Sequence, residues 1–103
     1  MKNPSPDTPR FGTLAIHAGQ DPEPTTGAII PPIFQTSTYV QPAAGEWGEV
    51  DYSRSGNPTR KNLETTLASI ESGAGALAFS SGMAAVHCVT MLCGKGDEIV
   101  AGS

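Results

Sequence analysis

The sequence has little of what a small protein uses to build a core of its own. Of its 103 residues 38% are hydrophobic and only 6% are aromatic, and a single tryptophan is present. A short chain buries a smaller fraction of its surface than a long one, so this composition leaves little apolar area to offset the entropy lost on folding. We therefore expect one small domain, or part of a larger one.

Other scarcities exclude whole classes of protein. Six basic residues against ten acidic ones give a net charge of -4, and no basic stretch is present, so we expect no nucleic-acid partner. No apolar run approaches the roughly 20 residues of a membrane helix, and none follows Lys2 as in a signal peptide. The two cysteines, Cys88 and Cys93, have the spacing of neither a metal motif nor a redox pair, which favours a reduced, cytoplasmic protein.

Proline is abundant, and eight of the nine lie before residue 43. Because proline fixes φ and pushes its predecessor to extended conformations, residues 1–51 are expected to form an extended N-terminal arm. Within it we expect a short helix over 14–18, with Thr13 as N-cap and Gly19 just past its end, and a strand or extended segment over 33–40. Such an arm needs a partner surface, in a larger chain or another subunit; an untethered tail is the alternative.

Residues 52–103 have a different pattern, that of the start of an α/β domain. Asn57 and Pro58 suit the beginning of a helix whose apolar residues recur at i, i+4 and i+7, and Gly73 and Gly75 would end it. A buried strand, a second helix with a C-cap glycine and a further strand are then expected at 76–79, 83–93 with Gly94, and 99–101. These last elements would form a βαβ unit with parallel strands.

A two-stranded parallel sheet needs both faces covered, and the sequence reaches its last residue directly after the second expected strand. We therefore expect the chain to be part of a longer protein. Residues 57–103 alone are expected to expose apolar faces and to aggregate or remain molten.

Ser80-Ser81-Gly82 interrupts the apolar run between the first expected strand and the second helix. In a βαβ unit ligands bind beyond the carboxyl ends of the strands, where helix N-termini offer N–H groups to anions. Ordinary N-cap chemistry explains the same three residues. A relaxed nucleophile elbow with Ser80 as the nucleophile of a hydrolase is a third interpretation, weakened because the only following histidine, His87, precedes the acidic residues Asp97 and Glu98.

Tyr52 and Arg54 form a second candidate site. In an extended chain their side chains point the same way, and a phenol beside a guanidinium binds phosphate or carboxylate well. The alternative is a solvated loop that leads into a capped helix. The two histidines, His17 and His87, have no partner at ligand spacing and favour structural or solvent-facing roles, and the three lysines (Lys2, Lys61 and Lys95) lack the buried setting that covalent catalysis needs.

Taken together, these motifs resemble the Cys/Met-metabolism family of pyridoxal-phosphate enzymes, to which cystathionine γ-lyase and cystathionine γ-synthase belong. The resemblance runs from about Phe11 to the end of the chain. It rests on AIHAGQ at 15–20, PPI at 31–33, YSRSGNPTR at 52–60, SGMA at 81–84 and GD at 96–97. It implies an α/β large domain of the aspartate-aminotransferase type.

The resemblance also implies residue roles. Gly82 and Met83 would donate backbone N–H groups to the phosphate of pyridoxal phosphate, and Tyr52 and Arg54 would reach the phosphate of a neighbouring subunit's cofactor. The arm would clasp that subunit, in a homotetramer whose active sites lie at dimer interfaces. Asp51 resembles an acidic position near the substrate.

The implied reaction is γ-elimination or γ-replacement on a sulfur amino acid, with cystathionine γ-lyase as first choice and γ-synthase next. The family's Schiff-base lysine, which lies in a Ser-x-Thr-Lys setting, has no counterpart here, so these residues alone are expected to be inactive. A non-catalytic module that binds phosphate or clasps a subunit is the alternative.

Overall fold

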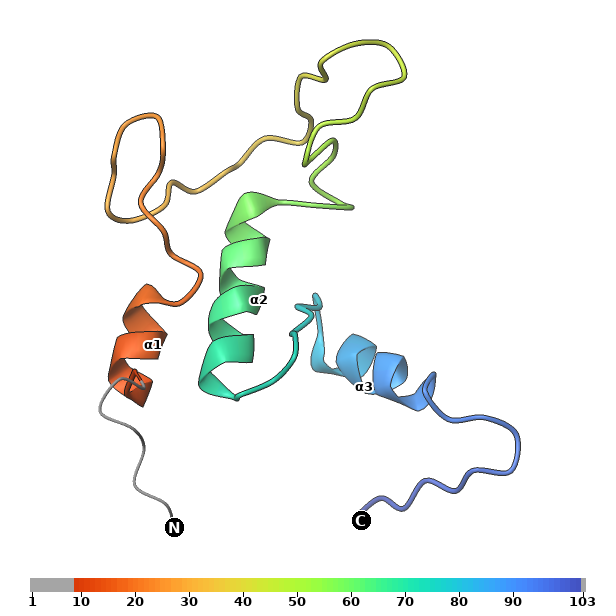
Figure 1. The fold of residues 1–103 in the computed structure, drawn as a ribbon. Helices are drawn as coiled ribbons and strands as arrows, with labels where there is room; N and C mark the ends of the chain where they lie inside the picture. The colour runs from red at the N-terminus through yellow and green to blue at the C-terminus, as the bar shows by residue number, and fades with distance from the viewer. Residues whose placement is uncertain (1–8, 103) are drawn as a thin grey trace.

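The computed structural model describes residues 9–102, which form three helices: α1 (Phe11–His17), α2 (Pro58–Ile70) and α3 (Gly82–Thr90). Figure 1 shows α1 beside α2, with wide irregular loops between them and a long irregular segment after α3. The radius of gyration is 18.1 Å, whereas a compact chain of this length has about 13 Å. The chain is open, and no residue within 9–102 is buried.

Helix α2 has both of its ends specified by local chemistry. The Oδ1 atom of Asn57 accepts hydrogen bonds from the N–H groups of Thr59 at 2.9 Å and Arg60 at 3.4 Å, which confirms the expected N-cap. At the other end Ser72 has a φ of 54°, and the Gly73 N–H donates to the Ala68 carbonyl at 2.8 Å. A serine, and not one of the expected glycines, therefore occupies the left-handed position of a Schellman-type ending.

Helix α1 packs on α2, and Gly19 permits the close approach just after it. Gly19 has a φ of +70°, and a Cβ there would lie 2.7 Å from Thr65 Cβ and 2.9 Å from the Asn62 carbonyl oxygen. The hydroxyl of Thr66 donates to the carbonyl of Ala18. Only glycine fits this position, because both its backbone conformation and its surroundings exclude a side chain.

Two expected helix boundaries are wrong. Helix α1 begins at Phe11 and not after Thr13: the Leu14 N–H already donates to the Arg10 carbonyl at 3.0 Å, without any side-chain cap. Helix α3 ends at Thr90, because the N–H groups of Leu92 and Cys93 bond carbonyls only three residues back in the tighter 3₁₀ pattern, so Gly94 lies beyond its end. No helix within residues 9–102 has the length and apolar character to cross a membrane.

The expected parallel pairing of 76–79 with 99–101 is also wrong. Within residues 9–102 the β interactions are isolated antiparallel bridges, Thr38 with Tyr52 and Ala43 with Glu46. A parallel strand is stable when its hydrogen-bond edges and both faces are covered. Here Leu77 is 71% exposed and Val100 is 90% exposed, so nothing in the described chain holds either segment in a sheet.

The arm has a partner within its own chain. Tyr39 N–H donates to the Asp51 carbonyl at 3.1 Å and Ser53 N–H donates to the Ser37 carbonyl at 2.9 Å, on either side of the Thr38–Tyr52 bridge. The Ser53–Ser37 bond and the Thr38–Tyr52 bridge cross the expected boundary between residues 51 and 52, and that division stays a prediction.

Candidate functional site

Tyr52 and Arg54 lie together at the surface, in a turn that we call the clamp loop (residues 51–56). The Arg54 Nη2 atom donates to the Tyr52 phenol oxygen at 2.9 Å, and the guanidinium carbon lies 5.2 Å from the centre of the ring. The loop is a turn and not the extended segment that was expected from the sequence, because Ser55 and Gly56 both donate backbone N–H groups to the Tyr52 carbonyl. The turn nevertheless places both side chains on one side, where the phenol and the remaining guanidinium N–H groups can donate to an anion.

Asp51 fixes this turn from within. Its Oδ1 atom accepts from the Ser55 hydroxyl at 2.9 Å and from the Tyr52 N–H at 2.7 Å. These hydrogen bonds, that of Ser55 foremost, lower the pKa of the Asp51 carboxyl below its usual value of 3.8. In this structure the carboxylate is engaged with its own loop.

Ser53 and Asn57 attach the clamp loop to the arm, a role that the sequence analysis missed. The Asn57 amide nitrogen donates to the Phe34 carbonyl and to the Ser53 hydroxyl, at 3.1 Å in each case. The Phe34 N–H in turn donates to the Thr59 hydroxyl at 2.9 Å. The NPT sequence at 57–59 signals a helix start, and nothing in it signals a partner more than 20 residues away.

The beginning of α3 combines a cap with free donors. The Ser81 hydroxyl accepts from the Ala84 N–H at 3.2 Å, which makes Ser81 the N-cap. The N–H groups of Gly82 and Met83 have no hydrogen-bond acceptor within residues 9–102. A Cβ at Gly82 would meet nothing within 4 Å, and both residues are exposed. Capping and anion binding are thus compatible at this helix start.

The two candidate pairs do not contact each other within the chain. No hydrogen bond or ion pair in the described part of the chain joins Tyr52 or Arg54 to Gly82 or Met83. Figure 1 shows the clamp loop beyond the N-terminal end of α2, whereas α3 follows the segment that leaves the C-terminal end of that helix. One copy of the chain therefore presents two separate sets of anion donors.

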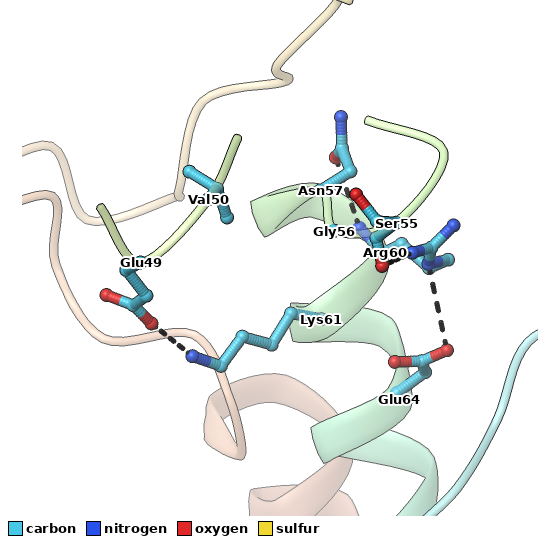
Figure 2. A pocket seen from close by; sticks show the side chains of 8 residues that line it. All are labelled: Glu49, Val50, Ser55, Gly56, Asn57, Arg60, Lys61 and Glu64. Carbon is cyan, nitrogen blue, oxygen red and sulfur yellow. Dashed lines mark hydrogen bonds and ion pairs between the residues drawn. The ribbon is translucent and has the colours of Figure 1, made fainter. Parts of the chain in front are cut away.

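A pocket of about 200 Å³ lies between the clamp loop and α2 (Figure 2). Four of its side chains are charged and form two ion pairs: Lys61 with Glu49, and Arg60 with Glu64 at 3.9 Å. The Lys61 pair is largely exposed. The Arg60 guanidinium also donates to the Ser55 carbonyl at 2.9 Å, beneath the clamp loop.

The remaining candidates have no site around them in the described chain. Within 9–102 the Ser80 hydroxyl makes no hydrogen bond, so no base activates it as a hydrolase would require. Neither His17 nor His87 belongs to any group of side chains there that could hold a metal ion. Cys88 and Cys93 are free thiols. Lys95 is exposed in a turn, and Lys2 lies outside the described residues.

Comparison with known proteins decides the family. The model of the Cys/Met metabolism PLP-dependent enzyme family matches residues 12–103. The chain belongs to this family. It is 49% identical over 92 residues to a probable cystathionine gamma-synthase of Herpetosiphon aurantiacus, covering 89% of this chain and 29% of that protein. It is 46% identical over 96 residues to human cystathionine gamma-lyase, covering 92% of this chain and 24% of that protein.

Solved structures of family members have a similar conformation over this region. The Lactobacillus plantarum cystathionine gamma-lyase, crystallised with L-serine, matches with a TM-score of 0.74 at 42% identity, over 85% of this chain and 23% of that one. The metB structure from Corynebacterium glutamicum matches with a TM-score of 0.77 at 40% identity, over 85% and 23%. The chain thus spans about a quarter of the length of these family members, all type I PLP enzymes.

The residues present fit the phosphate group of pyridoxal phosphate. Gly82 and Met83 are exposed and supply backbone donors at the positive end of a helix dipole. Tyr52 and Arg54 supply a phenol and a guanidinium held side by side. Both are donor types that bind phosphate dianions, and neither set contains a carboxylate aimed at the donors.

Proposed function

We propose that this chain is the N-terminal part of a PLP-dependent transsulfuration enzyme that performs γ-elimination or γ-replacement on sulfur amino acids. Cystathionine γ-lyase activity is our first choice and γ-synthase activity the second. The family membership and the named relatives support this proposal, although the chain spans only about a quarter of their length. We also propose that the enzyme is a homotetramer. We place it in the cytoplasm, in keeping with its free thiols.

In this proposal the two donor pairs bind phosphate groups of two different cofactors. Gly82 and Met83 would donate N–H groups to the cofactor of their own subunit, and Tyr52 and Arg54 to the cofactor of a neighbouring one. The observation that carries this arrangement is that both pairs are exposed and share no hydrogen bond or ion pair within residues 9–102. When bound, pyridoxal phosphate supplies the electron sink that stabilises negative charge at the substrate Cα.

None of the described lysines suits the covalent anchor that such an enzyme needs. Lys61 is held by Glu49 on an exposed helix face, and Lys95 is exposed in a turn. A lysine activated for imine chemistry is desolvated or placed beside another cation. We therefore propose that the anchoring lysine lies elsewhere in the complete protein and that these 103 residues are inactive alone.

The test uses the protein encoded by the complete reading frame. We expect it to bind pyridoxal phosphate and to release cysteine, ammonia and an α-keto acid from cystathionine, as γ-elimination requires. We expect Arg54→Ala to weaken cofactor binding by about 10- to 100-fold, because hydrogen bonds to a charged group are lost. Lys61→Ala, on the neighbouring exposed face, serves as the matched control. A protein that binds the cofactor but catalyses neither γ-elimination nor γ-replacement would support the non-catalytic module instead, and unchanged affinity in Arg54→Ala would refute the clamp role.

A further inference from the structure

Arg60 connects α2 to the backbone of the clamp loop. Its guanidinium donates from Nη2 to the Ser55 carbonyl at 2.9 Å and from Nη1 to the Arg54 carbonyl at 3.4 Å. The planar fork of arginine suits two adjacent acceptors, and a lysine ammonium has no equivalent geometry. Arg60 therefore holds the clamp loop at Arg54, whose side chain is a proposed phosphate donor, and at Ser55, the next residue.

Glu64 lies one turn further along α2 and extends this connection in the other direction. Its Oε1 atom lies 3.9 Å from the Arg60 Nε and accepts a hydrogen bond from the Ala78 N–H at 2.8 Å (Figure 2 shows the ion pair). Ala78 belongs to the segment that leads directly into Ser81 and Gly82. One carboxylate thus joins the arginine under the clamp loop to the backbone that positions the start of α3.

We propose that Arg60 and Glu64 are positioning residues for phosphate binding: from successive turns of α2 they fix the clamp loop and the segment before Gly82 relative to one another. The inference rests on the proposed function, because it concerns the same phosphate donors. Neither residue would touch the cofactor. In the assembled enzyme the pair would connect the donors for the neighbouring subunit's cofactor, Tyr52 and Arg54, with the donors for the chain's own cofactor, Gly82 and Met83.

The geometry favours a positioning role over a contribution to stability. An exposed ion pair at i,i+4 contributes little, and the order of arginine before glutamate is the less favourable one on a helix. The side chains of Arg60 and Glu64 are 36% and 23% exposed, so neither is a core residue. What these side chains supply is hydrogen bonds to three backbone groups outside their own helix.

The first experiment replaces Arg60 in the full-length protein. We expect Arg60→Ala to raise the Kd for pyridoxal phosphate about tenfold and to move the ³¹P resonance of the bound cofactor toward that of free cofactor, while the thermal midpoint changes little. Arg60→Lys keeps the charge but not the fork and is expected to recover only part of the affinity. Lys61→Ala, which removes the adjacent exposed ion pair, should leave the Kd and the resonance unchanged.

The second experiment separates the two contacts of Glu64. Glu64→Gln keeps an oxygen that accepts from the Ala78 N–H but removes the charge facing Arg60, whereas Glu64→Ala removes both contacts. We expect Glu64→Gln to stay within about threefold of the parent Kd and Glu64→Ala to weaken binding about tenfold. Equal effects of the two substitutions would overturn the role assigned to the Ala78 contact.

Failure of this inference differs from failure of the proposed function. If Arg54→Ala weakens binding while Arg60→Ala leaves the Kd and the ³¹P resonance unchanged, the donors are correct and the positioning role is wrong. If Arg54→Ala has no effect either, the proposed phosphate clamp itself fails. A fall in thermal midpoint without any ³¹P change would make Arg60 a purely structural residue and would also overturn the inference.

Discussion

The region around the clamp loop and the segment from residue 74 to 102 differ in what holds them in place. In the first, polar side chains bond backbone groups distant in sequence, as Asn57 does with the Phe34 carbonyl and Thr59 with the Phe34 N–H. In the second, apolar side chains dominate and remain uncovered, with Leu92 84% exposed and Val100 90% exposed. Hydrogen bonds can specify a loop without a core, whereas an apolar strand needs a surface to cover it.

The largest expected effect concerns this difference directly. The 103-residue chain alone is expected to unfold without a cooperative thermal transition and to bind a hydrophobic dye, because no residue within 9–102 is buried. Calorimetry and dye fluorescence measure the two properties, with the full-length protein as control. A sharp calorimetric transition from the monomeric chain would show that the apolar segment from residue 74 to 102 is covered within the chain, and would contradict the contrast between the regions.

Gly19→Ala should destabilise the full-length protein by about 3 kcal/mol, because a Cβ would clash with backbone and with Thr65 at a positive φ. Urea denaturation measures the loss. Gly12→Ala is the matched control: it lies inside α1, its Cβ would meet nothing within 4 Å, and alanine favours a helix by about 0.5–1 kcal/mol.

Gly82→Ala tests the other region with the same substitution. A Cβ at Gly82 would meet nothing within 4 Å, so stability should hold, while the added methyl group would limit the close approach of a phosphate to the backbone. We expect the Kd for pyridoxal phosphate to rise with little change in the urea midpoint. Loss of stability without loss of affinity would assign Gly82 to packing.

Asn57 should contribute less than Gly19 but through two separable contacts. Asn57→Ala removes the cap and the bond to the Phe34 carbonyl, at a cost of about 1–2 kcal/mol. Asn57→Asp keeps the capping oxygen and loses the amide bonds to the Phe34 carbonyl and the Ser53 hydroxyl, so it should recover the part of this stability that the cap supplies. Urea denaturation of both variants measures the two parts, and equal losses would show that the tie to the arm dominates.

The features that were predictable from the sequence are those fixed by neighbouring residues. The start of α2 at Asn57 and Pro58 follows from capping chemistry within three positions, and the start of α3 after Ser81 follows in the same way. The pairing of 76–79 with 99–101 failed because a sheet depends on surfaces that no local pattern contains. The attachment of Phe34 to Thr59 was missed for the same reason, since hydroxyl–backbone bonds carry no periodic signal.

The smallest expected effect is a pH dependence confined to the clamp loop. The Ser55 hydroxyl, followed by the Tyr52 N–H, lowers the pKa of Asp51 below 3.8 in the folded chain. A group whose pKa falls on folding contributes stability that is complete above its unfolded pKa and is lost as pH falls through the folded pKa. The loop should therefore keep its conformation at neutral pH and loosen only below about pH 4.

Carbon-13 NMR titration of the Asp51 carboxyl in the full-length protein measures this dependence. Ser55→Ala removes the largest cause and should raise the midpoint toward 3.8, while the Tyr52 N–H still accounts for part of the shift. Ser69→Ala, whose hydroxyl bonds only the Thr65 carbonyl within α2, should leave the midpoint unchanged. Solvent screens the charge of the exposed Asp51 carboxylate, so the effect is small. A midpoint insensitive to Ser55→Ala would contradict the role of the Ser55 hydroxyl and leave the Tyr52 N–H as the group that lowers the pKa.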